Sequence, residues 1–404
     1  MMKFINEIEK EDLNGKKVLL RVDFNVSTKE EKIPNGKIQT RIVSDFKINA
    51  QKETINYLLE NGAKILLVSH HNQLQSFLPI LEEISTILGQ IISLVPHTEF
   101  SSLDLLLQTA PLLLLDNVRQ DPREEKNDEE FAKSLSNGFD FFVNDAFAVS
   151  HRRHASVSAV AKLLPSYGGF LMKKEVENLS QAVETKAEGK VLVLGGAKIS
   201  TKLSVIQNFL DKAEKILIGG ALANDFWQTQ GINIGASLVD DSVAVNQLGN
   251  HVSKLILPRD ILISKGWTLE KVKSVMSQGS TLGSLKVEPL ISEIRDLNPD
   301  EAIVDIGPQS AQDFAKIIKN SETVVWNGPL GLSEVGKFAS GTSIIAKVVA
   351  EAKKSIIGGG DTITAVAKLG LLDKFGYVST GGGAMLEFLA GRRLPGLEAL
   401  GYYN

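Results

Sequence analysis

Six times between Lys190 and Met385, a short apolar run ends in a turn of small residues, and this pattern restricts the possible folds most. The runs are VLVLGGAK from Val191, ILIGGALAN from Ile216, AIVDIGP from Ala302, TVVWNGP from Thr323, SIIGGGD from Ser355 and YVSTGGGA from Tyr377. Runs that are apolar at successive positions are typical of strands buried on both faces. Most precede a stretch with apolar residues at helical spacing. This order predicts a parallel sheet with helices on both faces.

The strands of the first half end in polar residues rather than glycine. The corresponding runs are VLLRVDFNV from Val18, ILLVSHH from Ile65, LLLLDNVR from Leu112 and FFVNDAF from Phe141. Ligands of open α/β sheets bind beyond the carboxyl ends of the strands, so two differently furnished sheets predict two different ligands. We therefore expect an α/β protein with two doubly wound, Rossmann-like parallel-sheet domains.

Length and composition agree with two globular domains. A chain of 404 residues exceeds what one hydrophobic core usually organises, so domains of roughly 200 residues are expected. The net charge of -4 gives no support to binding of nucleic acid or a membrane. The absence of cysteine excludes disulfides, thiolate metal sites and cysteine nucleophiles. Neither a signal-peptide core nor a run of about 20 apolar residues occurs, which predicts a cytoplasmic protein.

The domain boundary is expected near residues 164–169, where LPSYGG interrupts the pattern. An N-terminal domain of residues 1–169 would precede residues 170–186, which have the pattern of one long helix. This helix either connects the domains or belongs to the surface of the second, residues 187–388. The sequence alone favours neither.

Cationic residue types gather where the strands of the first half end. They are Arg21, Arg41, His70, Arg119, His151, Arg152, Arg153 and His154. Arginine binds carboxylate and phosphate through paired hydrogen bonds, so the set predicts a small anionic ligand. Any one arginine alone is equally well explained by an ion pair with a surface acid. Their position at four strand ends favours the ligand.

The turn GGAKISTK, from Gly195, has the composition of a phosphate-binding loop. Glycine precedes a helix start, and Lys198 and Lys202 lie four residues apart on one helical face. Lysines at this spacing usually only face solvent, and the preceding glycines are what favour phosphate.

Two further turns, GGGDT from Gly358 and STGGG from Ser379, permit close approach of the backbone to phosphate. Asp361 stands at a helix start, where it caps the helix, holds a Mg²⁺ ion that bridges nucleotide phosphates, or does both. The amides of STGGG would face a phosphoryl group in transfer.

Two familiar nucleotide motifs are not supported. GLSEVGK, from Gly331, matches the first seven positions of a P-loop, but Phe338 stands where Ser or Thr must bind Mg²⁺. No GxGxxG follows any of the runs, which disfavours a dinucleotide-dependent dehydrogenase.

Together these segments resemble the phosphoglycerate kinase family along nearly the whole chain. The matching segments are RVDFNV from Arg21, TRI around Arg41, NVR ending at Arg119, VNDAF from Val143, HRRHAS from His151, GGAKIS from Gly195, WNGP from Trp326, GGGDT from Gly358, STGGGA from Ser379 and LPGLEAL from Leu394. The resemblance implies two domains facing a cleft and joined by a hinge helix. It implies 3-phosphoglycerate on the N-terminal domain, Mg²⁺ with ATP or ADP on the C-terminal one, and residues 389–404 returning to the first domain. It also implies a monomer.

The implied roles attach to matching positions. Those implied for 3-phosphoglycerate are Asp23, Asn25, Arg41, His70, Arg119 and Arg152. Those implied for the nucleotide are Gly196, Ala197, Lys198, Lys202, Gly220, Asn327, Glu334, Gly358, Gly359, Gly360, Asp361 and Thr362. Glu334 would bind the ribose hydroxyls and Asp361 the Mg²⁺. Arg41 and Lys198 are the expected catalytic residues, which would stabilise the transferring phosphoryl group.

The implied reaction gives 1,3-bisphosphoglycerate and ADP, and it runs toward ATP in glycolysis. The acceptor carboxylate, with a pKa of about 3.5, is ionised at neutral pH, so no general base is required. Alignment and charge neutralisation remain. Ligands on separate domains must be brought together, so we expect a hinge closure in which residues 170–186 take part.

The chain departs from the family pattern after the second strand. SHHNQL, from Ser69, stands where the family usually has SHLGRP, so Gln73 replaces an arginine. An arginine bond to phosphate is worth about 1.5 to 3 kcal/mol, which predicts an affinity lower by about tenfold to a hundredfold unless another group compensates. Arg153, where the family usually has alanine, is the candidate. The other departures near the sites are Gln120, Ala221 and Ser333.

Two alternative functions remain open. One is a nucleotide-binding paralogue with weakened turnover of the acid substrate, which Gln73 favours and the retained Arg41, Lys198, Lys202 and Asp361 disfavour. The other is a kinase of the same fold that acts on another small carboxylate.

Overall fold

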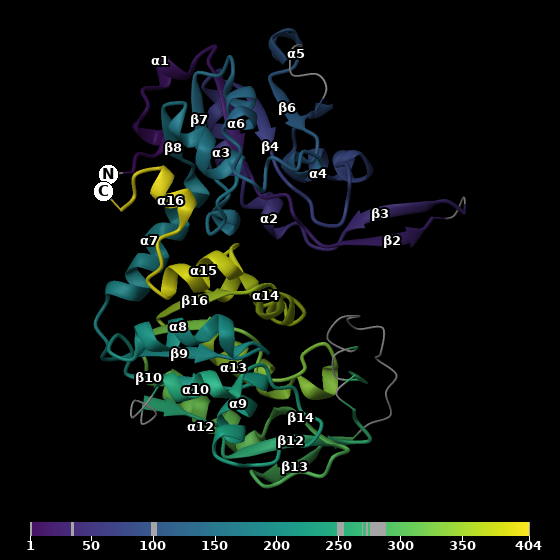
Figure 1. The fold of residues 1–404 in the computed structure, drawn as a ribbon, viewed down its shortest axis with the longest axis vertical. Helices are drawn as coiled ribbons and strands as arrows, with labels where there is room; N and C mark the ends of the chain where they lie inside the picture. The colour runs from purple at the N-terminus through teal and green to yellow at the C-terminus, as the bar shows by residue number, and fades with distance from the viewer. Residues whose placement is uncertain are drawn as a thin grey trace. The chain divides into compact units, whose positions relative to one another are not determined.

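The computed structural model describes residues 2–33, 36–97, 103–248, 254–268, 270–271, 274 and 288–403. The chain forms two compact units (Figure 1): unit 1 comprises residues 1–177 and 393–404, and unit 2 comprises residues 178–392. The helix α7 (Phe170–Glu184) contains the point where the chain passes from unit 1 to unit 2. These limits differ from the predicted divisions at residues 169, 186 and 388, because the start of α7 belongs to unit 1, where Met172 donates its backbone N–H to Asp145 Oδ1 at 2.9 Å. The functional division of the chain stays a prediction.

Unit 1 is built on a six-stranded parallel sheet of order β5-β6-β4-β1-β7-β8. The strands are β1 (Lys17–Arg21), β4 (Lys64–Val68), β5 (Ser93–Val95), β6 (Leu112–Leu115), β7 (Phe141–Asn144) and β8 (Ser166–Gly168). Val18 and Leu20 of β1 pack in one hydrophobic core, whereas Leu19 packs in another. Because alternate residues enter different cores, the run must be apolar throughout.

Helices and short turns complete unit 1. They are η1 (Ile5–Glu7), α1 (Lys10–Leu13), α2 (Phe46–Asn49), α3 (Lys52–Glu60), η2 (Leu78–Ile80), α4 (Leu81–Leu88), α5 (Leu103–Thr109), η4 (Val118–Gln120), α6 (Glu129–Ser136), η5 (Phe147–Val149), η6 (Ala155–Ala159), η7 (Val160–Lys162) and α16 (Pro395–Ala399). An antiparallel ribbon of β2 (Thr28–Lys32) and β3 (Ile38–Ile42) extends from the rest of this unit (Figure 1).

Unit 2 contains a second six-stranded parallel sheet, of order β11-β10-β9-β15-β16-β17. Its strands are β9 (Lys190–Leu194), β10 (Lys215–Ile218), β11 (Leu255–Ile256), β15 (Thr323–Asn327), β16 (Lys354–Gly358) and β17 (Tyr377–Val378). The helices and turns are α8 (Ile199–Phe209), α9 (Ala221–Thr229), α10 (Ser242–Val245), α12 (Pro308–Lys319), η10 (Gly336–Phe338), α13 (Ser340–Ala350), α14 (Gly360–Ala367), η11 (Leu372–Lys374) and α15 (Gly382–Leu389). Two parallel-sheet α/β units confirm the predicted fold class. No helix among the described residues is long and apolar enough to cross a membrane.

One of the six predicted parallel strands is placed differently. The run from Ala302 forms β14 (Glu301–Ile306), which pairs antiparallel with β12 (Asp260–Lys265) in a three-stranded sheet completed by β13 (Leu290–Glu293). Ala302 and Val304 enter a small core with Trp267, whereas Ile306 enters the main core of unit 2. The strand is buried on both faces because two cores flank it, so its apolar pattern matched that of a parallel strand and the prediction was wrong.

Glu301 fastens the start of β14, and its contribution should depend on pH. Its oxygens accept from Arg295 Nη1 and Nη2 at 3.0 and 3.1 Å and from the Asn298 N–H at 2.9 Å. The Arg295 hydrogen bonds, followed by the bond from Asn298, lower the pKa of Glu301 from 4.5 to about 2. A carboxyl whose pKa is lower in the folded state stabilises the protein above its ordinary pKa, and this contribution is lost as pH falls toward the folded value.

We expect Glu301→Gln to lower the free energy of unfolding at pH 7 by about 1.5 to 3 kcal/mol, because charge-assisted hydrogen bonds are weakened. The difference from wild type should shrink at pH 3, and urea unfolding at both pH values measures it. The control is Glu130→Gln, because the Glu130 side chain is 76% exposed and pairs only with Lys133. An equal loss at both pH values would contradict the role of the carboxylate.

Candidate active site

Arg21, the last residue of β1, is buried at the carboxyl end of the unit 1 sheet with 1% of its surface exposed. Its Nε donates to Ser156 Oγ at 2.8 Å, and its Nη1 donates to the carbonyl oxygens of Val22 and Val68. Its Nη2 lies 3.3 Å from His70 Nδ1. A guanidinium can only donate, so His70 Nδ1 accepts and the imidazole proton lies on Nε2. His70 Nε2 is buried, and no described residue forms a hydrogen bond with it.

A buried carboxylate balances Arg21 through a shared serine. Ser156 donates from its backbone N–H and its hydroxyl to Glu124, at 2.9 and 2.6 Å. Burial lowers the pKa of Arg21, and Glu124 and then Asp23 oppose this shift. Burial raises the pKa of Glu124, and Arg21 opposes it. The hydrogen bonds from Arg21 to Ser156 and from Ser156 to Glu124 therefore hold the guanidinium of Arg21 in place. Through its contact with Arg21, the ring of His70 is held as well.

The histidines of this cluster are neutral at physiological pH. Burial, followed by the charge of Arg21, lowers the pKa of His70 to about 2. Burial and Arg152 lower the pKa of His151 to about 4, and burial and Arg119 do the same for His154. His70, His151 and His154 are therefore not cationic, although the sequence groups them with the arginines, because burial and then the neighbouring guanidiniums suppress their protonation. They provide neutral hydrogen-bonding groups instead.

Arg119 and Arg152 supply the remaining positive charge. Arg119 donates from Nη1 to Asn72 Oδ1, and its Nε lies 3.1 Å from Glu125 Oε1. Burial lowers the pKa of Arg119, and Arg152 lowers it further. Both residues also lower the pKa of Arg21. The three guanidiniums are thus close enough to repel one another, and an anionic ligand would relieve this repulsion.

Asp23 and Asn25 follow β1 and lie beside the cluster. Asp23 is 2% exposed, its Oδ2 is 2.8 Å from Lys47 Nζ, and its Oδ1 accepts from the Asn25 N–H at 3.1 Å. Burial raises the pKa of Asp23, but the ammonium of Lys47, with a smaller effect of Arg21, lowers it below its ordinary value. Asp23 is therefore ionised and can only accept hydrogen bonds.

Three sequence-predicted residues lie outside the cluster. Arg41 is on β3, and its charge has a small lowering effect on the pKa of Glu31 of the paired strand β2. Arg153 is exposed, and its Nη2 lies 3.5 Å from Glu398 Oε2 in α16; its compensation for the missing arginine stays a prediction. Gln73 accepts a hydrogen bond from Thr28 Oγ1 at 3.3 Å.

In unit 2 two of the three predicted phosphate-binding turns, GGAKISTK and GGGDT, line one pocket of about 580 Å³; the third, STGGG, contributes no lining residue, although Gly382 packs against Gly359. The lining residues of this pocket are Gly196, Ala197, Lys198, Thr201, Lys202, Asn327, Gly328, Pro329, Gly359, Asp361 and Thr362. We refer to it as the phosphate pocket. Lys202 is largely buried, which lowers its pKa, while Asp361 and Asp240 oppose that shift. Eight of the twelve residues implied for the nucleotide therefore meet here, all but Gly220, Glu334, Gly358 and Gly360.

Two side chains tie the turns of the phosphate pocket together. Asn327 Nδ2 donates to the Gly358 carbonyl at 3.0 Å, and Thr362 Oγ1 accepts from the Gly328 N–H at 2.7 Å. Gly359 has a φ of +98°, a conformation that disfavours other residues. The roles of Asn327 and Thr362 in this geometry are to hold the backbone in place.

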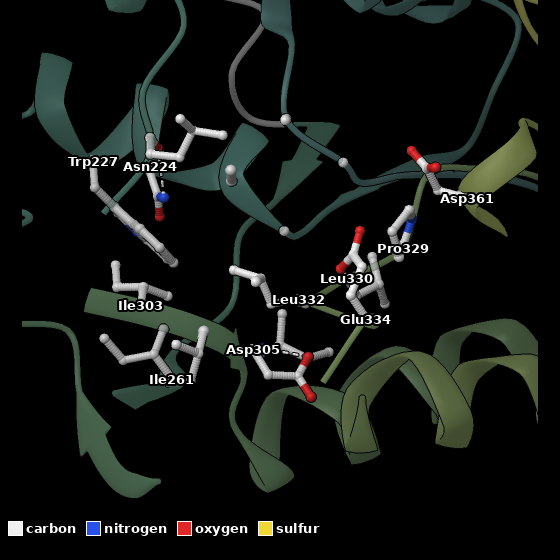
Figure 2. Close-up of a pocket in the computed structure, with 18 residues that line it drawn as sticks. Asn224, Trp227, Ile261, Ile303, Asp305, Pro329, Leu330, Leu332, Glu334 and Asp361 are labelled. Carbon is white, nitrogen blue, oxygen red and sulfur yellow. Dashed lines mark hydrogen bonds between the residues drawn. The ribbon is translucent and has the colours of Figure 1, made fainter. Parts of the chain in front are cut away.

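A second pocket, of about 650 Å³, adjoins the first (Figure 2). The two share Gly196, Ala197, Pro329 and Asp361, and the second also contains Gly220 and Glu334. Burial raises the pKa of Glu334. The other walls are largely apolar and include Trp227, Leu238, Ile261, Ile303 and Leu332. We refer to it as the apolar pocket.

Sequence reasoning missed several residues of both sites. In unit 1 they are Lys47, Glu124 and Ser156, which are single polar residues in ordinary surroundings of the sequence. The walls of the apolar pocket resemble common core residues. One signal was present, because Asn224 and Trp227 are three residues apart on α9, immediately after a glycine turn, and so share a helical face.

The fold and the two sites define a small-molecule kinase. Unit 2 contains glycine turns with lysines beside an apolar pocket. Unit 1 contains an anion site without a titrating base. The chain belongs to the phosphoglycerate kinase family, whose sequence model, described as "Phosphoglycerate kinase", matches residues 8–392. Kinases of this family transfer a phosphoryl group between ATP or ADP and the carboxylate of 3-phosphoglycerate, and the chain is a kinase of this kind.

Individual relatives agree along the whole chain. The chain is 40% identical to the phosphoglycerate kinase of Thermosipho africanus over 96% of each sequence. It is 38% identical to that of Coprothermobacter proteolyticus over 98% of each. The solved structure from Coxiella burnetii matches with a TM-score of 0.78 and 31% identity, over 100% of this chain and 99% of the other. That from Pyrococcus horikoshii matches with a TM-score of 0.82 and 29% identity, over 99% and 98%. The expected family is confirmed, and no comparison supports the weakened paralogue.

Gly220 provides a test of the close packing between the two pockets. It has a φ of +63°, and an added Cβ would lie 2.7 Å from the Pro329 carbonyl oxygen and 2.8 Å from the Gly196 nitrogen. Gly231 has a φ of +81° with nothing within 4 Å of its Cβ position, which makes it a matched control. Alanine in the left-handed region costs about 1 to 2 kcal/mol of backbone strain, and Gly220, with a ψ of −161°, lies outside that region in a conformation adopted almost only by glycine.

We expect Gly220→Ala to weaken binding of Mg-ADP by about tenfold or more, because the turns at both backbone contacts must move. Gly231→Ala should leave the affinity unchanged. Isothermal titration calorimetry measures both, and equal affinities of the two variants would contradict this account of the turn.

Proposed function

We propose that the chain catalyses reversible, Mg²⁺-dependent transfer of the γ-phosphoryl group of ATP to 3-phosphoglycerate, with the two substrates on different units. The observation that carries the proposal is the division of polar groups. Guanidiniums and neutral imidazoles end the strands of unit 1, whereas glycine turns and buried Lys202 line the phosphate pocket of unit 2. Membership of the family supports the reaction.

The residues proposed to bind 3-phosphoglycerate are Asp23, Asn25, Arg41, His70, Arg119 and Arg152. Arg119 and Arg152 supply positive charge to the phosphate, and His70 Nε2 supplies a neutral donor. Ionised Asp23 accepts from the substrate hydroxyl, because a carboxylate has no proton to donate.

The nucleotide is proposed to lie across both pockets of unit 2. Lys198 and Lys202 contact its phosphates beside the turns that contain Gly196, Ala197, Asn327, Gly359 and Thr362. Gly358 and Gly360 lie on either side of Gly359 in the sequence. Gly220 and Glu334 line the apolar pocket, where Glu334 accepts hydrogen bonds from the ribose hydroxyls.

Asp361 fits a Mg²⁺ ion shared with the nucleotide. Among the described residues, no group of three or more His, Asp or Glu side chains converges as a metal site. Mg²⁺ is commonly held by one or two carboxylates together with phosphate oxygens and water, so a single carboxylate in the phosphate pocket is sufficient. When bound, the ion would neutralise charge on the phosphates.

The transfer needs no general base. An oxygen of the 3-phosphoglycerate carboxylate attacks the γ-phosphorus while the bond from that phosphorus to the β,γ-bridging oxygen breaks, and no proton moves. Lys198, the residue before α8, and Arg41 are proposed to stabilise the charge on the transferring group.

Closure of the two units is part of the proposal, because reactants on separate units must meet. The chain passes between the units only within α7 and between residues 392 and 393, so these are the proposed hinges. The monomeric state and the cytoplasmic location stay predictions, and sedimentation equilibrium would test the first.

We expect steady-state turnover with 3-phosphoglycerate and none with glycerate, because the guanidiniums require the phosphate group. Removal of Mg²⁺ with EDTA should abolish turnover. Failure of the wild-type protein with 3-phosphoglycerate would overturn the proposal.

Arg119→Ala should raise the KM for 3-phosphoglycerate by about tenfold or more, because one charged contact is lost. The KM for ATP should not change.

Arg153→Ala is the matched control, since Arg153 is one residue from Arg152 but pairs with Glu398. It should leave both KM values unchanged. If Arg153→Ala raised the KM for 3-phosphoglycerate as much as Arg119→Ala, Arg153 would be the compensating residue, and the present assignment would be wrong. Gln73→Arg should lower that KM if the lost arginine contact is uncompensated.

The chain contains no cysteine, so labels for measuring closure can be attached at introduced sites. Lys133→Cys in unit 1 and Lys316→Cys in unit 2 place dyes on side chains that are 56% and 75% exposed. We expect energy transfer between the dyes to change more when Mg-ADP and 3-phosphoglycerate are both present than with either alone. The same transfer efficiency in all conditions would contradict closure.

A further inference from the structure

Asn224 is a polar side chain in an apolar part of the apolar pocket. It lies on α9 with 1% of its surface exposed, and its neighbours in the pocket lining include Trp227, Leu238 and Ile303. Figure 2 shows the Asn224 amide beside the Trp227 ring, at the end of the pocket away from Asp361. Neither Asn224 nor Trp227 lines the phosphate pocket. A nucleotide with its phosphates at Lys198 and Lys202 would therefore extend its base toward Asn224.

The orientation of the Asn224 amide is determined by one hydrogen bond. Its Nδ2 donates to the Leu238 carbonyl at 2.8 Å. Because a backbone carbonyl only accepts, the amide nitrogen must be on this side, and Oδ1 points the other way. Asn224 Oδ1 is buried, and no described residue donates to it. A buried acceptor without a donor is unfavourable, so this oxygen is suited to a donor carried by a ligand.

The carboxyl groups that line the apolar pocket either already accept hydrogen bonds from the protein or lie at a different end of the pocket from Asn224. Asp305 accepts from the Ile306 N–H at 2.9 Å, the Gly341 N–H at 2.8 Å and Ser340 Oγ at 3.1 Å. These donors occupy both of its oxygens. Glu334 lies at the end of the pocket that also holds Asp361 (Figure 2). Among the side chains that line the described pocket, Asn224 Oδ1 is therefore the buried acceptor suited to a base.

We propose that Asn224 Oδ1 accepts a hydrogen bond from the exocyclic amino group of the base, and that Asn224 thereby makes the site select a 6-aminopurine over a 6-oxopurine. This inference rests on the proposed function, since it assumes that a nucleotide occupies both pockets. Adenine carries an amino donor at C6, whereas hypoxanthine carries a carbonyl oxygen there. With the base in the same position, that oxygen would face Asn224 Oδ1 acceptor to acceptor, and the N1–H of hypoxanthine would reach Oδ1 only after a shift of the ring.

The test compares Mg-ADP with Mg-IDP, which share the sugar and phosphates and differ in the purine at C6 and N1. Binding to the wild-type protein is measured by isothermal titration calorimetry, without turnover. We expect ADP to bind about ten- to a hundredfold more tightly than IDP. Equal affinities would overturn the inference and leave the proposed kinase function standing. Binding of neither nucleotide would overturn both.

Asn224→Leu removes the acceptor while keeping a side chain of similar size. The loss of the bond to Leu238 can weaken all nucleotides, so the decisive quantity is the ratio of the two dissociation constants. We expect the ratio to fall to within about twofold of unity. A ratio that stays at the wild-type value while both affinities fall would show a purely structural role and overturn the inference. If the variant does not fold, as judged by its thermal transition, the wild-type ratio still decides.

Discussion

A buried positive charge organises the polar end of the unit 1 sheet. Arg21 continues an apolar strand into a position where 1% of its surface is exposed, so its charge must be balanced and its donors used. Glu124 provides the balance through Ser156, and two carbonyl oxygens take further donors. The remaining donor, Arg21 Nη2, faces His70. This arrangement keeps the His70 ring neutral and fixes its orientation. The substrate contacts proposed for unit 1 depend on this network.

Unit 2 meets a similar demand for anion binding with backbone rather than side chains. Glycines at Gly196, Gly220 and Gly359 have positive φ and let three turns approach one another, so amides and two lysines can surround phosphate. Backbone amides carry no net charge and do not repel one another. Like-charge suppression in the phosphate pocket is limited to its two lysines, where burial and, as a smaller effect, Lys198 lower the pKa of Lys202.

The sequence predicted those features that repeat or cluster along the chain. The two parallel sheets, the glycine turns and the polar strand ends were visible because each is a local pattern. The position of β14 was not, since burial between two cores produces the same apolar run as a parallel strand. The protonation of His151 and His154 was also not visible, because it depends on burial and then on the positions of Arg119 and Arg152 in space. The role of Asn224 was not predicted for the same reason, because only the structure shows that no described residue donates to its Oδ1.

The replacement at Gln73 has two electrostatic consequences. An arginine there would add a contact to the substrate phosphate, which favours binding. It would also add a charge near Arg119, whose pKa burial and Arg152 already lower, and so would increase repulsion while the site is empty. The loop is held instead by neutral bonds, with the backbone N–H groups of Gln73 and Leu74 donating to His71 Nδ1 at 3.2 and 3.0 Å. A free site with less repulsion gains less when an anion binds, so this change adds to the loss of the contact: Gln73 stabilises the empty site and lowers the affinity for the phosphate.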